Sequence, residues 1–475
     1  MADENEVLGP GEGGGLRRAA LRAGLYLVGR HGLDVTLALV AEPLIARLVG
    51  PFSYGVWIAA QRVFLYLALV FALGIDVYLV RKEGETDAND YHQAFTLLLL
   101  LGIAGAGTGL LAIPILRKWI AIEGFGAVAT TMVIALPVVL STRVPMARLE
   151  RALDYRSVAI IEVSGRLLFY VVVVALAFLE WGVWAIVVGF WMQLALNAAL
   201  ALVRARYRPR LTLKTEAIRR MVGYGAGFSA AVWVYRLHNL VNPLVVGRFA
   251  GAEAVGYVGL AERIVNSVGF VRNAGWRLSL AVLGRVQDSK ERMARAVDEG
   301  IRLQVMALGP LLLAVGFALP LAAVALFGEK WKPLPAIYPF VAVEFLVTTI
   351  FALQSSALNV MGRNYRLAAC NAVHILLFAI LAELLVRRIG WLGYGWAALA
   401  AMPAFWLVHR LFVREVGGRL DYRLTGGVAA ACAMGLFWQQ LGWISLLGFI
   451  ALAVWPLTWR TLKVYALQLG ALRYG

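Results

Sequence analysis

Apolar runs long enough to cross a membrane recur along the whole chain. A helix needs about 20 consecutive apolar residues to span the hydrocarbon core of a bilayer. The runs are continuous rather than alternating, so they favour helices over the strands of a β-barrel. The pattern predicts an all-α polytopic membrane protein with about fourteen transmembrane helices, at roughly 23–46, 55–80, 93–115, 125–146, 157–179, 182–203, 223–247, 254–283, 301–327, 335–361, 367–389, 391–413, 424–441 and 442–460.

The two halves of this pattern resemble each other. Residues 47–63 align with 248–264 at an offset of 201, and the shared positions are Arg47/Arg248, Gly50/Gly251, Gly55/Gly256, Ala60/Ala261 and Arg62/Arg263. Six spans per half is an even number, so the halves keep the same orientation, as in parallel-repeat transporters. We therefore expect two pseudo-symmetric six-helix lobes plus two C-terminal helices. The expected parts are a disordered cytoplasmic tail at 1–22, lobes at 23–203 and 223–415 with a basic linker at 204–222 between them, and extra helices with a tail at 424–475.

Composition and charge add the setting. The chain is 61% hydrophobic and 15% charged, which excludes an ordinary soluble domain, and its formal net charge is +17. The Lys and Arg residues fall mostly in the connections that lie inside if the N-terminus is inside. The positive-inside rule therefore predicts that both termini face the cytoplasm. The linker "RARYRPRLTLKTEAIRRM" is read either as an interfacial segment that holds anionic lipid or as a topogenic charge cluster.

Polar side chains nevertheless occur inside several spans. At about 100° per residue, Arg263, Asn266, Asn273 and Arg277 share one helical face in "AERIVNSVGFVRNAGWR". Three other spans also have a polar face, and we expect all four faces to line one central cavity. Arg30 and Asp34 share the first of these faces, Arg62 and Asp76 the second, and Arg236, Ser229 and Asn239 the third. A charge at the bilayer centre costs about 2.5–3.5 kcal/mol or more, so such groups should face protein or water.

The sign of these charges indicates the ligand. Guanidinium groups bind phosphate and pyrophosphate through two parallel hydrogen bonds, so an arginine-rich cavity favours a phosphate-bearing anion. The alternative is internal pairing, for example between Arg30 and Asp34. Intramembrane acids and a histidine are candidates for coupling transport to an ion gradient, and these are Asp34, Asp76, Glu262 and His238.

No motif predicts catalysis. The sequence has no Gly-Lys dipeptide and hence no P-loop, no G-x-S-x-G and no H-E-x-x-H. Cys370 and Cys432 lie in separate apolar segments and predict neither a disulfide nor a metal site. We expect a protein that is not an enzyme and that needs no cofactor or metal.

Several motifs in order resemble one family. "RLVGPFSYGVW", "LGIDVYLVRKEGE", "RALDYRSVAIIEVSG", "VVGRFAGAEAVGYVGLAERI", "RVQDSKERM" and "LFGEKW" look like the polysaccharide flippases of the Wzx type, within the multidrug/oligosaccharidyl-lipid/polysaccharide exporter superfamily. The resemblance covers about residues 20–415. It implies two six-helix lobes, alternating access, and transfer of undecaprenyl-pyrophosphate-linked oligosaccharide across the bacterial inner membrane, with cavity arginines that hold the pyrophosphate or acidic sugars.

The resemblance also implies partners, namely the lipid-linked oligosaccharide and possible glycosyltransferases and a polymerase of the same pathway. Two other functions stay open. A cation-coupled multidrug exporter of the same superfamily would need an acidic or apolar cavity, whereas the predicted one is basic. A polytopic glycosyltransferase or polymerase would need a large outer loop, and the predicted outer loops are short.

Overall fold

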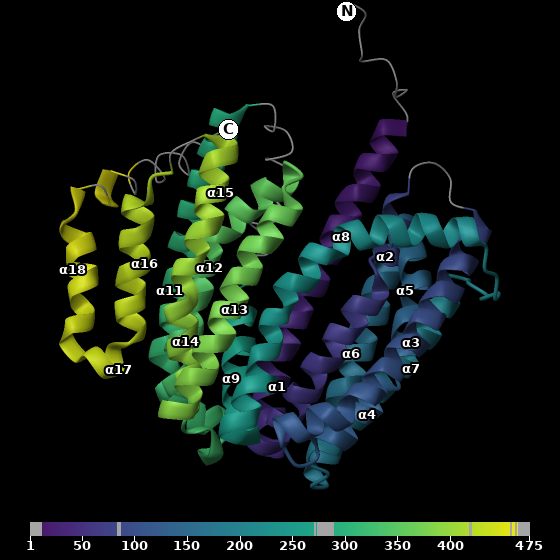
Figure 1. Ribbon diagram of the computed structural model, residues 1–475, viewed down its shortest axis with the longest axis horizontal. Coiled ribbons are helices and arrows are strands. Elements are labelled where there is room, and N and C mark those ends of the chain that lie inside the picture. The colour runs from purple at the N-terminus through teal and green to yellow at the C-terminus, as the bar shows by residue number, and fades with distance from the viewer. Residues whose placement is uncertain are drawn as a thin grey trace, which may run out of the picture. The chain divides into compact units, whose positions relative to one another are not determined.

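The computed structural model describes residues 12–82, 87–269, 272, 289–417, 420–456, 458–460 and 463. For residues 12–31, 33–36, 38, 39, 217 and 224–231 it describes the backbone alone. The chain divides into two compact units, unit 1 from Met1 to Leu244 and unit 2 from Val245 to Gly475. All regular elements in the described ranges are helices (Figure 1).

Unit 1 is a bundle of helices, and its first helix, α1, is broken at Gly50. Its helices are α1 (Glu12–Ala72), α2 (Ile75–Arg81), α3 (Ala88–Ile120), α4 (Phe125–Val133), α5 (Leu136–Arg151), α6 (Tyr155–Phe178), α7 (Val183–Arg204) and α8 (Thr215–Val241). The core is apolar, and α1 packs against α3, α4 and α6 while α6 packs against α7. Close approach of α3 to α5 depends on Gly102, where an added Cβ would lie 2.5 Å from the Cα of Pro137.

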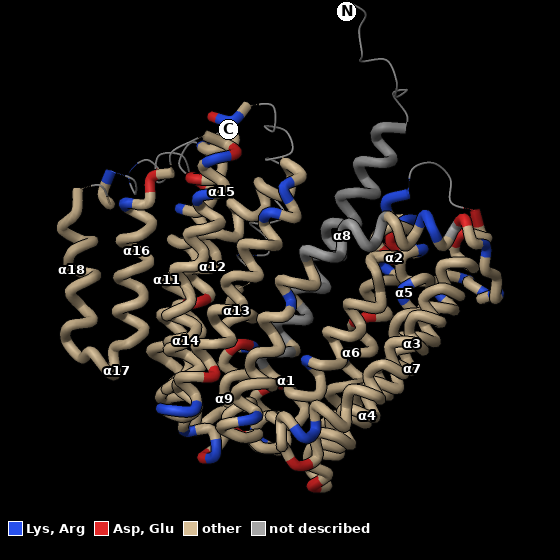
Figure 2. The backbone as a smooth tube through the Cα atoms, in the orientation of Figure 1, with Lys and Arg blue, Asp and Glu red and all other residues tan. Residues whose placement is uncertain are grey.

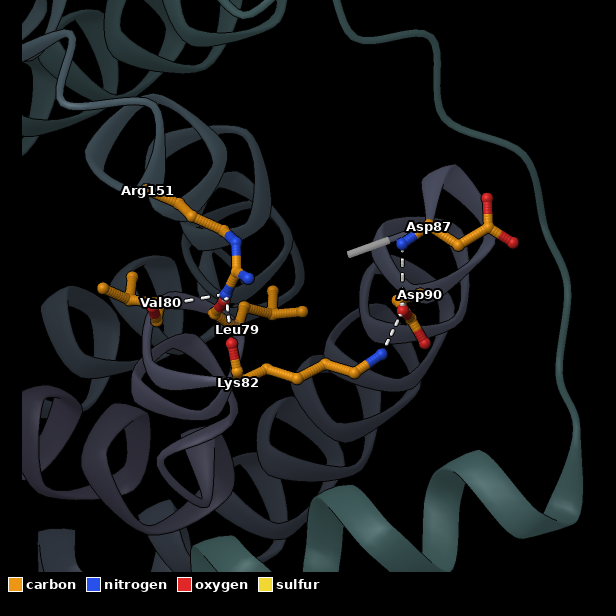
Figure 3. Close-up of polar contacts among 6 residues, drawn as sticks. All are labelled: Leu79, Val80, Lys82, Asp87, Asp90 and Arg151. Atoms are coloured by element: carbon orange, nitrogen blue, oxygen red, sulfur yellow. Dashed lines mark hydrogen bonds and ion pairs between the residues drawn. The ribbon is translucent and has the colours of Figure 1, made fainter. Parts of the chain in front are cut away.

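One end of unit 1 is held by polar contacts between α2, α3 and α5 (Figure 3). The helix α2 ends with carbonyl groups that have no partner within the helix, as every helix does. The Arg151 guanidinium donates to the carbonyls of Leu79 at 2.9 Å and Lys82 at 2.8 Å. The Lys82 ammonium in turn pairs with Asp90 on α3. Arg151 therefore caps α2 and fixes it beside α3 and α5.

Unit 2 contains α9 (Gly247–Val268), α11 (Lys290–Phe327), α12 (Leu334–Val360), α13 (Asn364–Ile389), α14 (Gly393–Ala401), α15 (Trp406–Val416), α16 (Tyr422–Leu436), α17 (Trp438–Leu441) and α18 (Leu447–Val454). The 3₁₀ turns η2 (Glu329–Trp331), η3 (Met402–Phe405) and η4 (Gly442–Leu446) lie between these helices, and the π-helical turn η1 (Asn242–Val246) precedes α9 where the chain passes from unit 1 to unit 2. The helix α12 is the central one, since most of its side chains are buried. In each unit the charged residues lie mostly near helix ends (Figure 2).

The membrane character predicted from the apolar runs is confirmed. Nine helices of the described residues are long and apolar enough to cross a membrane, and eleven spans result if each of two bent pairs counts as one. The bent pairs are α4 with α5, at 40°, and α16 with the helix over Trp438–Val454, at 71°. The predicted count of fourteen and the predicted boundaries of the lobes, linker and tail stay predictions.

Candidate functional site

The same backbone break precedes the two repeat-related arginines. Gly50 in α1 has φ 76° and ψ 167°, and Gly251 in α9 has φ 84° and ψ −179°. This region of conformational space is open essentially to glycine alone. Arg62 and Arg263 each follow their glycine by twelve residues. The match that the sequence alignment predicted therefore extends to local backbone geometry.

Each break is followed by a buried stretch that leads to the arginine. In unit 1 this stretch includes Trp57 and Ala60, and in unit 2 it includes Val258 and Ala261. The arginines themselves are half-buried. A half-buried guanidinium in a span must have polar surroundings, because desolvating it without partners is costly. Both arginines make polar or electrostatic interactions within the structure.

The predicted stripe of unit 2 is partly described. Glu262 accepts a hydrogen bond of 2.8 Å from the hydroxyl of Tyr394 on α14. The Asn266 amide is exposed and donates to the backbone carbonyl of Glu262 at 2.7 Å, and the Ser267 hydroxyl donates to the carbonyl of Arg263 at 2.9 Å. Asn273 and Arg277 lie outside the described residues.

The guanidinium of Arg272, which the helical projection places opposite the stripe, lies 3.8 Å from the ring centroid of Phe345. This distance is typical of a cation–π contact. Arg272 therefore packs on an aromatic ring of α12, and it is not part of the predicted face.

In unit 1 the prediction that Arg62 and Asp76 lie on one face of a single helix is wrong. The helix α1 ends at Ala72, and Leu73 and Gly74 adopt positive φ values of 48° and 64°. Asp76 consequently belongs to the separate helix α2. Its carboxylate pairs with the guanidinium of Arg143 on α5 at 3.0 Å, a partner that the sequence pattern did not indicate.

A buried carboxylate was also missed. Glu42 on α1 is 7% exposed, and it accepts hydrogen bonds from the hydroxyls of Tyr54 at 3.3 Å and Tyr170 at 3.5 Å. The signal was present in the sequence, because an acid within an apolar span is a functional candidate by default. The tyrosine partners of Glu42 lie 12 and 128 positions away in the sequence, so the pattern did not indicate them.

The remaining candidates lie on α1 and α8. The side chains of Arg30, Asp34 and Ser229 lie outside the described residues, and Arg236 is exposed while His238 and Asn239 are half-buried. Arg62 and Arg236 belong to unit 1 and Arg263 to unit 2, so the cavity that would hold all three stays a prediction. Among the described residues, no group of three His, Cys, Asp or Glu side chains is placed to hold a metal ion.

Comparison with known proteins gives the family. The model of the family described as "Polysaccharide biosynthesis protein" matches residues 44–336, which include both glycine breaks and both repeat-related arginines. The chain belongs to this family. It is 23% identical over 300 residues to the succinoglycan biosynthesis transport protein ExoT of Rhizobium meliloti (strain 1021), a match that covers 62% of this chain and 60% of ExoT.

A second relative is the teichuronic acid biosynthesis protein TuaB of Bacillus subtilis (strain 168), 21% identical over 218 residues. That match covers 45% of each chain, so the alignments span less than two thirds of either relative's length.

Solved structures support the fold. The lipid II flippase MurJ in an inward closed conformation aligns with a TM-score of 0.68 at 13% identity, over 91% of this chain and 96% of MurJ. An inward-facing multidrug transporter of the MATE family in the MOP superfamily aligns with a TM-score of 0.67 at 16% identity, over 81% of this chain and 94% of the transporter. The chain is therefore a multi-pass membrane protein with the fold of the MOP transporters, as the motifs predicted.

Proposed function

We propose that this protein is a flippase that moves an undecaprenyl-pyrophosphate-linked oligosaccharide across the bacterial inner membrane by alternating access. Arg62, Arg236, Arg263 and Arg277, with Arg30 from the first span, line the cavity and bind the pyrophosphate or acidic sugars. Asn266 and Asn273 add hydrogen-bond donors for the sugar portion. Both termini face the cytoplasm.

One observation carries this proposal. Arg62 and Arg263 are half-buried, they lie within the segment that matches the polysaccharide family, and each follows the same glycine break at the same distance. An apolar bundle keeps charged groups at repeat-related places only where they gain polar partners or a ligand. Guanidinium groups there favour a phosphate-bearing anion over the cationic substrates of a multidrug exporter.

The energy source would be an ion gradient or the membrane potential, since moving one elementary charge across 100 mV is worth about 2.3 kcal/mol. Asp34, Glu262 and His238 remain coupling candidates, and Glu42 joins them because its buried carboxylate accepts hydrogen bonds from two tyrosine hydroxyls. Asp76 is the weakest candidate, because its ion pair with Arg143 already satisfies it. Proposed partners are anionic membrane lipids and the glycosyltransferases and polymerase that make and use the oligosaccharide.

Complementation of polysaccharide export tests the role of Arg263. If the guanidinium binds pyrophosphate through two parallel hydrogen bonds, both Arg263→Ala and Arg263→Lys should reduce export at least about tenfold, because lysine keeps the charge and loses the planar fork. The exposed Arg295 on α11 provides the control, and Arg295→Ala should export normally.

Expression level and melting temperature in detergent separate the alternatives. Export restored by Arg263→Lys would mean that the residue sets only the electrostatic potential. Normal export by a well-folded Arg263→Ala protein would remove Arg263 from the substrate path. Resistance to cationic drugs in the same cells, without polysaccharide export, would replace this proposal with a multidrug exporter.

A further inference from the structure

The segment between α7 and α8 is fixed to α3. We name residues 204–214 the basic strap. The hydroxyl of Tyr207 donates to the carbonyl of Tyr91 at 3.1 Å and lies 3.1 Å from Nδ1 of His92, which fits a His92 tautomer with its hydrogen on Nδ1. The backbone N–H of Thr212 donates to the hydroxyl of Thr96 at 3.0 Å. The strap is therefore held at two points along α3.

Tyr207 is suited to this anchoring role. It is only 4% exposed, and its ring stacks on that of His92 with 5.4 Å between centroids. Burial raises the pKa of the Tyr207 hydroxyl, and the positive charge of Arg148 offsets part of this rise. The hydroxyl consequently stays protonated at physiological pH and remains a hydrogen-bond donor to the carbonyl of Tyr91.

Anchoring on one side exposes the arginines on the other. Ala205 and Tyr207 are buried, whereas the four arginines of the strap are exposed, and these are Arg204, Arg206, Arg208 and Arg210. Leu211 is 71% exposed and Leu213 is 48% exposed, so apolar side chains accompany the charges. The start of α8 continues the basic surface with exposed Arg219 and Arg220.

Charge complementarity decides the partner. The strap contains no Asp or Glu, and Glu216 is the first acid that follows it. Its four arginines make no ion pair with any carboxylate in the part of the chain that the structure describes. The strap leaves directly from the end of the candidate span Val183–Arg204, and the headgroup region of a bilayer begins where a span ends. Basic residues with interspersed apolar side chains are typical of segments that bind the surface of an anionic membrane.

We propose that the basic strap is a docking surface for anionic lipid headgroups of the leaflet that it faces. The arginines contact the phosphates, and Leu211 and Leu213 enter the headgroup region. The contacts of Tyr207 and Thr212 with α3 fix the strap backbone before lipid arrives, which reduces the entropy lost on binding. Lipid docking by the strap requires a membrane-inserted protein and does not depend on which substrate the protein moves.

Lipid retention by the full chain tests this inference. The protein is purified in a mild detergent, phosphatidylglycerol or zwitterionic phosphatidylethanolamine is added, and bound lipids are counted by native mass spectrometry. One variant changes all four strap arginines to Gln. Each basic residue near an anionic surface contributes about fivefold, and four such contributions multiply to several hundredfold. We therefore expect its affinity for phosphatidylglycerol to fall on the order of a hundredfold or more.

A control with the same change in net charge replaces four exposed arginines of unit 2, namely Arg292, Arg295, Arg410 and Arg414, with Gln. It should retain phosphatidylglycerol like the native protein. Lysine at the four strap positions should restore most retention, because an anionic surface responds mainly to charge. Raising the salt concentration from about 0.05 M to about 0.5 M should release phosphatidylglycerol from the native protein, because salt screens the attraction between charges. This test uses the native protein and therefore does not depend on how well the Gln variant folds.

The contrary outcomes are distinct. Equal retention by the strap variant and the native protein would limit the strap to setting topology. Equal losses in strap and control variants would show a general effect of net charge. Either result, or retention that is insensitive to salt, overturns the proposal.

Discussion

At the scale of single residues, the buried acid Glu42 shows what a sequence pattern can and cannot predict. Its place within an apolar span can be read directly from the sequence. Its partners cannot, because Tyr54 and Tyr170 lie 12 and 128 positions away and reach it only through the packing of α1 and α6. The same limit explains Asp76, whose partner Arg143 lies 67 positions away. A helical projection can be drawn from the sequence, whereas the residue at which a helix ends and the contacts it makes with other helices depend on tertiary structure.

The hydroxyl of Tyr54 should matter for stability. Tyr54→Phe removes one hydrogen-bond donor from a buried carboxylate and should lower the free energy of unfolding by about 1 kcal/mol, measured from the melting temperature in detergent. The control Tyr365→Phe changes a tyrosine that is 75% exposed and should leave the melting temperature unchanged. Equal effects of the two substitutions would argue against a role for the contact with Glu42.

At the scale of elements, the internal repeat aligned Gly50 with Gly251, while the backbone break at each glycine was found only in the structure. An added Cβ at Gly251 would meet nothing within 4 Å, so backbone strain alone opposes a side chain there. Gly251→Ala should therefore destabilise the protein by about 1–3 kcal/mol. Gly107 in α3 also has open space around it but is helical, and Gly107→Ala should be neutral or stabilising. Unfolding curves that show equal stability for both variants would contradict the proposed strain.

The cap on α2 gives a second prediction at this scale. Arg151→Leu leaves the terminal carbonyls of Leu79 and Lys82 without their donor and removes a positive charge from a helix C-terminus, so it should cost about 1–3 kcal/mol. Arg156 on α6 is exposed, and Arg156→Leu should have little effect. Thermal unfolding of both variants in the same detergent makes the comparison, and a loss confined to the Arg156 variant would contradict the capping role.

At the scale of the whole molecule, hydrophobic periodicity was sufficient for the fold class, because a span must satisfy its backbone internally and be apolar over a set length. It was less informative about boundaries. The sequence predicts a loop before the second span, whereas the chain stays helical on both sides of Gly50. The predicted span 125–146 is bent, and the last two predicted spans form the 71° pair whose first helix has only 15 residues. The packing of helices against one another determines these boundaries and bends, and the hydrophobic pattern of one helix does not predict them.

Orientation in the membrane can be tested on the basic strap. The contacts of Tyr207 with Tyr91 and of Thr212 with Thr96 place the strap at the end of unit 1 where α3 begins, while the connection from α6 to α7 follows at the other end of those helices. The positive-inside rule assigns the strap to the cytoplasm. In a background of Cys370→Ser and Cys432→Ser, an impermeant maleimide should label Arg208→Cys only in inverted membranes and Glu180→Cys only in spheroplasts. Labelling of Arg208→Cys in spheroplasts would show that the predicted orientation is the wrong way round. The strap would then meet lipids of the outer leaflet, and the proposed direction of transport would also be reversed.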